Sequence, residues 1–390
     1  MRGVVWPLVV TMAIQALVSM AVFSPPVLAP AAHVEIGFPA SWVGLVTTLT
    51  FASATLGALF SGGVIARLGA LRMSQLSLLL CGAGIALIAS ADPWLVALGA
   101  LIMGAGYGPV TPSSSAILVD RTPEHMRAFI FSLKQTGVPI GGALAGAIVP
   151  ALVVAANWKI SALAVGVICW ALAVAIQPYR AAVDLAPHRI APSKPASLLE
   201  PLRFVLGHPR LREMGLASAA YSGMQACLAT FLVVYLHQRV GFSVPVAGAA
   251  LATAMSAGIV GRIAWGIVAD HWVRPRALLG IIGLTMSACA AMTAAFSDHW
   301  PVAIVFAVSF VYGATAIGWN GVYLSEVARI APAGRAGSAT GASLAMTYAG
   351  VVVLPSVFWI IVGLSGSYAA GFLAAAALSL WRSSYFLRGR

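Results

Sequence analysis

Apolar stretches of about twenty residues or more recur along the 390-residue chain, and each can cross the hydrocarbon core of a bilayer. Only 8% of the residues are charged, against about 25% in a soluble domain. A helix satisfies its own backbone hydrogen bonds in lipid, so an all-α polytopic membrane protein is expected. We predict twelve spans: residues 4–30, 41–66, 73–91, 94–119, 128–155, 159–177, 213–238, 243–269, 277–296, 301–328, 336–363 and 367–382.

Lysine and arginine gather at one set of span ends. Of 22 such residues, 18 fall on that side, and only Lys159 and Arg239 fall on the other. The positive-inside rule makes the basic side cytoplasmic, with both termini there, and predicts a multi-pass protein of the cytoplasmic (inner) membrane. The net charge of +12 is then explained by topology and contact with anionic membrane lipid rather than by nucleic acid.

A polar, proline-containing segment divides the spans six and six, which predicts units at 1–178 and 213–390 joined by a cytoplasmic linker, 179–212. Around the second and eighth spans an offset of 204 residues aligns the two halves without gaps. The shared register ends in the same basic residue and indicates an internal repeat. The matched pairs are Gly44 with Gly248, Gly57 with Gly261, Gly62 with Gly266, Val64 with Val268 and Arg72 with Arg276.

The segments "GGVIARLGALR" (62–72) and "GRIAWGIVADHWVRPR" (261–276) resemble the cytoplasmic loop signature of the major facilitator superfamily, G-x-x-x-D-R-x-G-R. The first copy has Ala66 in place of the aspartate, and the second keeps Asp270 but has His271 in place of the arginine. The resemblance implies two six-helix bundles related by a pseudo-two-fold axis, with no cofactor or metal. It also implies a conformational switch, in which Asp270, Arg276, Glu326 and Arg335 form an ion network. The alternative is ordinary interfacial charge without a switch. The residues of the predicted switch are Gly62, Arg67, Gly69, Arg72, Asp120, Arg127, Gly266, Asp270, Arg276, Glu326 and Arg335.

In this superfamily the first, fourth, seventh and tenth helices line the transport cavity, and polar residues of this chain follow that scheme. Tyr312, Trp319 and Tyr323 share one helical face and would suit an organic solute. Helix packing is the alternative for the aromatic residues, and a hydrogen bond to a neighbouring helix is the alternative for the glutamines. The candidate substrate ligands on these spans are Gln15, Tyr107, Tyr221, Gln225, Tyr312, Trp319 and Asn320.

Lys134 and Arg262 are the two basic residues inside spans, and we add both to the candidate ligands. A buried cation costs roughly 2.5–3.5 kcal/mol on insertion scales. All ten acidic residues lie at span ends or in loops, so the counter-charge could be the substrate. Arg262 is similar in position to the substrate-binding arginine of oxalate/formate, monocarboxylate and nitrate carriers, although Ala58 stands where nitrate carriers have a second arginine. The alternatives are a Lys134 that reaches the surface and an Arg262 that follows a widespread glycine-arginine pattern.

Gly137-x-x-x-Gly141 and Gly142-x-x-x-Gly146 have the spacing that lets two helices approach closely. We expect them to form a sliding seam with the span 243–269, which contains Gly258 and Gly261, and expect a bend at Pro139. The group "GVPIGG" resembles the antiporter signature G-P-x-x-G-G, but its proline lies one residue closer to the glycine pair.

Together these features predict a monomeric secondary transporter that moves a small organic anion of the carboxylate type by rocker-switch alternating access. Coupling to a proton stays open, because no span has an acidic residue near its middle. The alternative is a proton-coupled exporter of drugs or metabolites. A membrane enzyme is not expected, since the sequence contains no H-E-x-x-H or G-x-S-x-G motif. A sensor that has lost transport is a further alternative.

Overall fold

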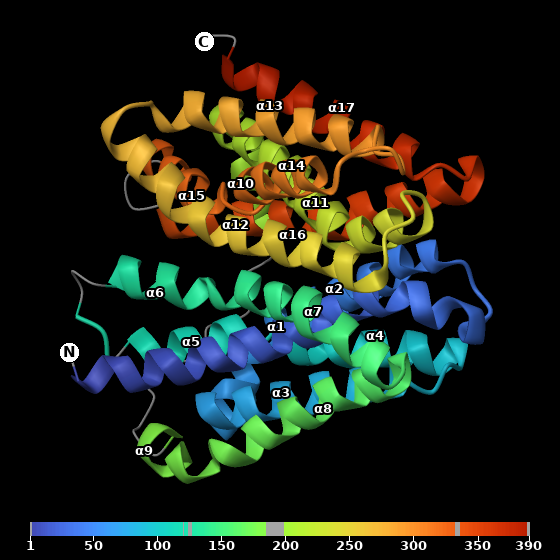
Figure 1. The fold of residues 1–390 in the computed structure, drawn as a ribbon. Helices are drawn as coiled ribbons and strands as arrows, with labels where there is room; N and C mark the ends of the chain where they lie inside the picture. The colour runs from blue at the N-terminus through green and yellow to red at the C-terminus, as the bar shows by residue number, and fades with distance from the viewer. Residues whose placement is uncertain (1, 120, 124–126, 185–198, 332–335, 388–390) are drawn as a thin grey trace. The chain divides into compact units, whose positions relative to one another are not determined.

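The computed structural model describes residues 2–119, 121–123, 127–184, 199–331 and 336–387 (Figure 1). The chain divides into two compact units, Met1–Ser193 and Lys194–Arg390. The helices of the first unit are α1 (Arg2–Ile36), α2 (Val43–Leu68), α3 (Ala70–Ile88), α4 (Pro93–Tyr107), α5 (Val110–Val119), α6 (Arg127–Gln135), α7 (Gly137–Ala155), α8 (Trp158–Ala175) and α9 (Arg180–Asp184), with short 3₁₀ turns η1 (Ala40–Trp42) and η3 (Gln177–Tyr179). Those of the second are α10 (Leu199–Gly207), α11 (Pro209–Gln238), α12 (Val244–His271), α13 (Pro275–Ala294), α14 (Val302–Ala316), α15 (Asn320–Ile330), α16 (Ala336–Ser365) and α17 (Tyr368–Leu387).

The predicted all-α fold is confirmed, and each predicted span coincides with one or two helices. Eleven helical stretches among the described residues are long and apolar enough to cross a membrane. The twelfth predicted span forms α17, which is not one of these eleven and whose last two turns hold Arg382 and several polar residues. Helices α9 and α10 fall within the segment predicted as a linker.

Three predicted spans are broken helices. The span 128–155 consists of α6 and α7 with a turn at Thr136, because Pro139 has no N–H for the Gln135 carbonyl and its ring crowds that group. The span 94–119 breaks between Tyr107 and Val110, where Pro109 and Pro112 have the same effect. The span 301–328 breaks around Gly318. Broken helices often border the binding site of a transporter, so the breaks direct attention to the side chains beside them.

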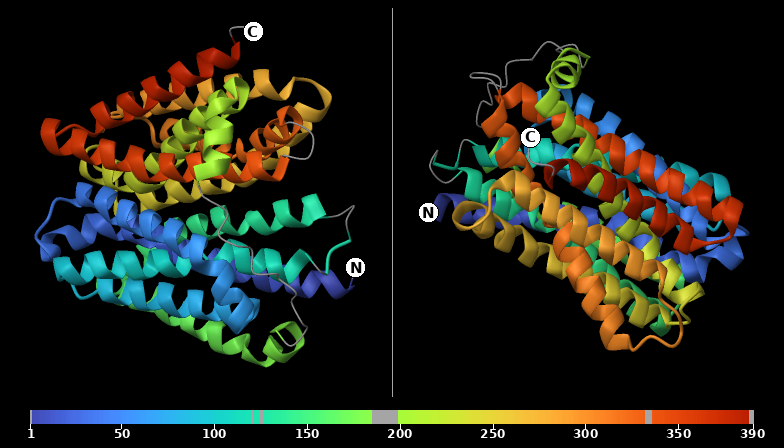
Figure 2. Two further views of the ribbon diagram at one scale, coloured as in Figure 1. Left: turned by 180° about the vertical axis from the view of Figure 1, so that it is seen from behind. Right: turned by 90° about the horizontal axis from the view of Figure 1, so that it is seen from above.

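Both units use the same helix pairing. In the first, α1 packs on α7, α2 on α4 and α3 on α8; in the second, α11 packs on α16, α12 on α14 and α13 on α17. Figure 1 shows α1 running beside α7, and Figure 2 shows the neighbouring helices of each unit from two further directions. This agreement supports the internal repeat predicted from the sequence.

Glycines at equivalent positions make the closest of these helix contacts. A Cβ at Gly104 would collide with the Thr50 carbonyl, and a Cβ at Gly313 with that of Ala254. Thr50 and Ala254 are separated by the same 204 residues that separate Gly57 from Gly261. The repeat is therefore preserved at the level of single backbone contacts.

The predicted contact between the glycines of span 128–155 and those of span 243–269 is wrong for four of these glycines, because each faces a helix of its own unit. A Cβ at Gly137 would lie 2.9 Å from the Gln15 Cβ, and one at Gly141 would collide with the Ala16 carbonyl, so both glycines face α1 of their own unit. Likewise Gly261 faces Ala314 of α14, and Gly258 faces Ile317 just after it. A small-residue spacing predicts a close approach but does not say which helix approaches.

Candidate functional site

Lys134 is the centre of a buried polar cluster in the first unit. It lies in the last turn of α6, where a helix end favours a positive charge, and is 1% exposed. Its Nζ donates to Gln15 Oε1 (3.0 Å), Gln135 Oε1 (3.1 Å) and Thr111 Oγ1 (3.4 Å). Among the described residues no carboxylate pairs with it, so the amine nitrogen is surrounded by neutral oxygens only.

The helix breaks bring this cluster together. Thr111 lies in the first turn of α5, just past the α4–α5 break, and Lys134 and Gln135 lie just before the α6–α7 break. Gln15 is 1% exposed, and its amide nitrogen donates to Ser19 Oγ (3.4 Å), which turns the carbonyl oxygen towards Lys134. The sequence predicted Gln15 and Lys134 as ligands but missed Thr111 and Gln135. The signals for these two were adjacency to Lys134 and to the proline-rich break.

Arg262 of α12 is half-buried in the second unit and lies at the α14–α15 break. Its Nε donates to the Ile317 carbonyl (3.3 Å), and Asn320 Nδ2 donates to the same oxygen (3.3 Å). The break frees this carbonyl from the α-helical pattern, and two predicted ligands converge on it. Asn320 Nδ2 carries a second N–H group that can bind an anionic or hydroxylated ligand.

Trp319 and Tyr323 add a buried aromatic wall to the second unit. The two rings lie 5.2 Å apart, and Tyr221 meets the Trp319 ring edge-on at 5.7 Å. Trp319 Nε1 is buried and has no hydrogen-bond partner among the described residues, whereas the Tyr323 hydroxyl interacts with Ser218 and Ser343. Buried donors without partners are rare and costly, which makes Trp319 Nε1 a candidate contact for a ligand.

Other predicted ligands have internal partners. The Tyr221 hydroxyl is hydrogen-bonded to the Leu279 carbonyl and to Ser383 Oγ, both at 2.9 Å, and the Tyr312 hydroxyl lies 2.7 Å from Met224 Sδ. Both residues therefore pack the interior of the second unit. Tyr107 meets Phe51 edge-on at 5.8 Å, and Gln225 is half-buried on α11.

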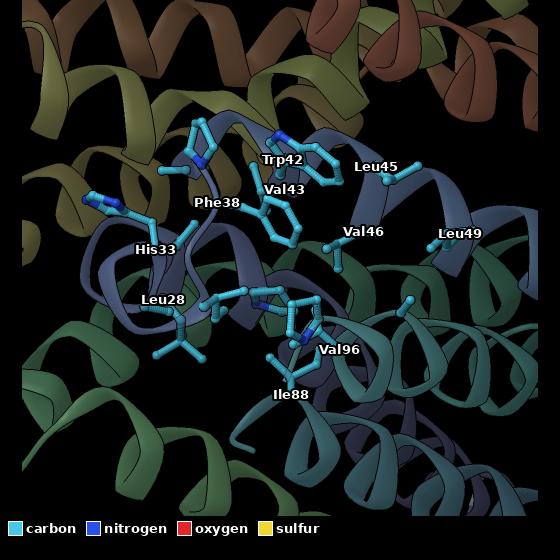
Figure 3. Close-up of a pocket in the computed structure, with 18 of the residues that line it drawn as sticks. Leu28, His33, Phe38, Trp42, Val43, Leu45, Val46, Leu49, Ile88 and Val96 are labelled. Atoms are coloured by element: carbon cyan, nitrogen blue, oxygen red, sulfur yellow. The ribbon is translucent and has the colours of Figure 1, made fainter. Parts of the chain in front are cut away.

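A separate cavity of about 420 Å³ lies in the first unit between the end of α1, the start of α2 and the start of α4. Its lining is apolar and aromatic, and Figure 3 shows Phe38 and Val46 pointing towards Val96. His33 is the one titratable side chain of this lining. None of the predicted substrate ligands lines the cavity, so it is a different site from the Lys134 cluster.

Comparison with known proteins identifies the family. The family model described as the Major Facilitator Superfamily matches residues 11–355. The chain belongs to the Major Facilitator Superfamily. It is a transporter and not an enzyme.

One relative of this superfamily member is the hexuronate transporter of Bacillus subtilis (strain 168), which is 24% identical over 315 residues, 74% of this chain and 71% of that protein. Two solved structures share the fold. The E. coli fucose:proton symporter covers 99% of each chain at 17% identity and a TM-score of 0.62. A bacterial homologue of the human lysosomal transporter Spinster, inward-facing and occupied, covers 98% of this chain and 96% of its own at 14% identity and a TM-score of 0.72.

The superfamily loop signature is only partly described. Asp120 and Arg335 lie outside the described residues. The surroundings of Gly62 and the side chains of Arg127 and Asp270 also lie outside the described part of the structure. Gly69 adopts a φ of +94° and ends α2, Arg67 is exposed, and a Cβ at Gly266 would meet open space.

Of the predicted ion network, the structure describes the side chains of Glu326 and Arg276. Glu326 is 2% exposed and bonds Arg329 of its own helix through both oxygens at 2.7 Å, which raises the pKa of Arg329. The Arg276 guanidinium lies 5.3 Å from the Tyr385 ring centre. A partner three residues away on one helix is within reach, so Arg329 is one partner of Glu326. The network with Asp270 and Arg335 stays a prediction, because both of these side chains lie outside the described residues.

Proposed function

We propose that the protein is a secondary transporter of a small organic anion of the carboxylate type, and that it works by rocker-switch alternating access. The observation that carries this proposal is the Lys134 ammonium, which is buried among neutral oxygens of Gln15, Gln135 and Thr111. An intramembrane charge without a counter-charge is expensive. A carboxylate that enters the site supplies that counter-charge.

The substrate class can be narrowed by the relative and by the second unit. The similar Bacillus protein is named for hexuronates, which are sugars with one carboxylate. Trp319 and Tyr323 offer an apolar wall with one unpartnered donor, Trp319 Nε1, among the described residues, which suits a hydroxylated ring. We propose Arg262 as a second cationic ligand for the substrate. A hexuronate is therefore the first substrate to test.

The proposal is tested by uptake into proteoliposomes that contain the full chain. The wild type is expected to accumulate D-galacturonate and not the neutral D-galactose, and Lys134→Met is expected to abolish that uptake. Imposed pH gradients of either sign test the proposed coupling proton. Unchanged galacturonate affinity in both Lys134→Met and Arg262→Gln would discard the anion site.

A second candidate function, export of lipophilic compounds, is favoured by the apolar cavity at Phe38, Val46 and Val96. Filling the cavity with Val46→Trp would then remove the resistance conferred by overexpression, whereas Lys134→Met would leave it intact. The two functions thus predict opposite responses to the same two variants. Under either function we propose the cytoplasmic membrane as the location, with both termini in the cytoplasm.

A further inference from the structure

The turn between α2 and α3 is held by an acidic residue from a distant part of the first unit. Asp184, the last residue of α9, accepts hydrogen bonds from the Leu71 amide at Oδ1 (2.9 Å) and from the Arg72 amide at Oδ2 (3.0 Å). The carboxylate is 6% exposed. These amides are in the first turn of α3, where a helix has unsatisfied N–H groups and favours a negative charge.

The turn is shaped to accept this carboxylate. Gly69 adopts a φ of +94°, and a Cβ at this position would collide with the Asp184 carboxyl group. A glycine is therefore required here for two independent reasons, the backbone conformation and the space that Asp184 occupies.

Side-chain contacts join the same turn to the end of α8. Arg72 Nη1 donates to Gln177 Oε1 (3.3 Å), and Gln75 Nε2 donates to that same oxygen and to the Ala173 carbonyl, both at 2.8 Å. The α2–α3 turn is thus attached to the segment that follows the sixth span, with Asp184 as its acidic member.

The second unit is built differently at the equivalent helix. Helix α13 starts with Pro275, which has no N–H and needs no acceptor at that position. Its loop copy also keeps the signature acid, Asp270, whereas the first unit has Ala66 there. The unit that lacks the signature carboxylate is the one in which a carboxylate arrives from elsewhere in the chain.

We propose that Asp184 is a positioning residue for transport, which replaces the carboxylate absent at Ala66 and fixes the α2–α3 turn, with Arg72, to the end of α8. The role of Asp184 in the transport cycle rests on the transport function proposed above. Asp184 touches no substrate and acts through the turn, so it sets the rate of the transport cycle rather than the affinity for the substrate.

Asp184→Asn tests this assignment, because an amide keeps the shape but replaces one charged acceptor by a donor. D-galacturonate uptake is expected to fall at least about tenfold in rate, with unchanged binding affinity, since charged acceptors form the stronger bonds. Amide hydrogen exchange at Leu71 and Arg72 is expected to become faster. The double variant Ala66→Asp with Asp184→Asn, which restores the signature acid, is expected to recover both uptake and slow exchange.

Arg180→Gln is the matched control. It removes the 3.8 Å ion pair between Arg180 Nε and Asp184 Oδ2 but leaves the two amide bonds, and uptake is expected to stay at the wild-type rate because that arginine is 44% exposed.

The proposal is overturned if Asp184→Asn transports at the wild-type rate, or if the folded double variant recovers neither property. A wild-type chain that ignores galacturonate would instead contradict the transport proposal. The exchange measurement needs no substrate and would still decide whether an acid at either position holds the turn.

Discussion

The two units share a backbone plan but differ in the chemistry placed on it. Gly141 and Gly350 contact the carbonyls of Ala16 and Ala219, which fixes the correspondence between α1–α7 and α11–α16. By that correspondence Lys134 and Gln15 of the first unit match Ser343 and Ser218 of the second. The first unit therefore carries a buried cation where the second carries two hydroxyls.

The second unit has its own cation at a different place. Arg262 corresponds to Ala58, and the Ile317 carbonyl that it bonds corresponds to Gly108, where a Cβ would crowd Ala54 and Ala58. Lys134 and Arg262, the basic residues in the interior of the predicted spans, thus lie at positions that the repeat does not relate. The duplicated fold determines where helices meet, and the side chains at these meeting points determine what is recognised.

The Arg262→Gln variant tests whether Arg262 of the second unit contributes to substrate binding as Lys134 of the first unit is proposed to do. Charged hydrogen bonds contribute about 1.5–3 kcal/mol, so galacturonate affinity is expected to fall roughly tenfold or more. Equilibrium binding to purified protein measures this, with the exposed Arg67→Gln as control. An unchanged affinity would leave Lys134 as the sole cationic ligand and make the two units unequal in function.

Alanine at Gly141 and at Gly350 tests whether the shared packing is equally tight in both units. Overpacking typically costs about 1–3 kcal/mol, and both substitutions place a Cβ against a backbone carbonyl that cannot move aside. Thermal unfolding of each single variant is expected to show a similar loss. A clear loss at only one position would show that the repeat is not conserved at these contacts.

Gln15→Leu removes the shortest hydrogen bond of the Lys134 ammonium. Bonds between helices in membranes contribute about 0.6–2 kcal/mol, so galacturonate affinity is expected to change by roughly three- to thirtyfold. Ser218→Ala, at the matching position of the second unit, is the control and is expected to leave affinity unchanged. Equal effects of the two substitutions would contradict the contrast between the units.

Tyr323→Phe is expected to have the smallest effect. It removes a buried hydroxyl whose interactions with Ser218 and Ser343 are not of ordinary hydrogen-bond geometry, so the free energy of unfolding is expected to fall by less than about 1 kcal/mol. Tyr221→Phe, whose hydroxyl has two partners, is expected to lose about 1 kcal/mol instead. If both variants lose stability equally in thermal unfolding, the Tyr323 hydroxyl is bonded as strongly as that of Tyr221, which would contradict this expectation.

The helices and the two central residues were predictable, because apolar length and isolated charge are local properties of the sequence. Gln15 and Lys134 were recognisable as polar groups far from span ends. The Asp184 cap was not, because it lies more than a hundred residues from Leu71 and its carboxylate follows no motif. The partner of Gly141 was missed for a similar reason, since spacing reveals a close approach but not the helix that makes it.

The central claim is that a carboxylate completes the Lys134 cluster. The most direct measurement is equilibrium binding of D-galacturonate and D-galactose to the purified wild type and to Lys134→Met. Since a charge-assisted hydrogen bond is worth about 1.5–3 kcal/mol, the wild type is expected to prefer the acid at least about tenfold and the variant to lose that preference. A Lys134→Met protein that still prefers galacturonate by the wild-type factor would contradict the account.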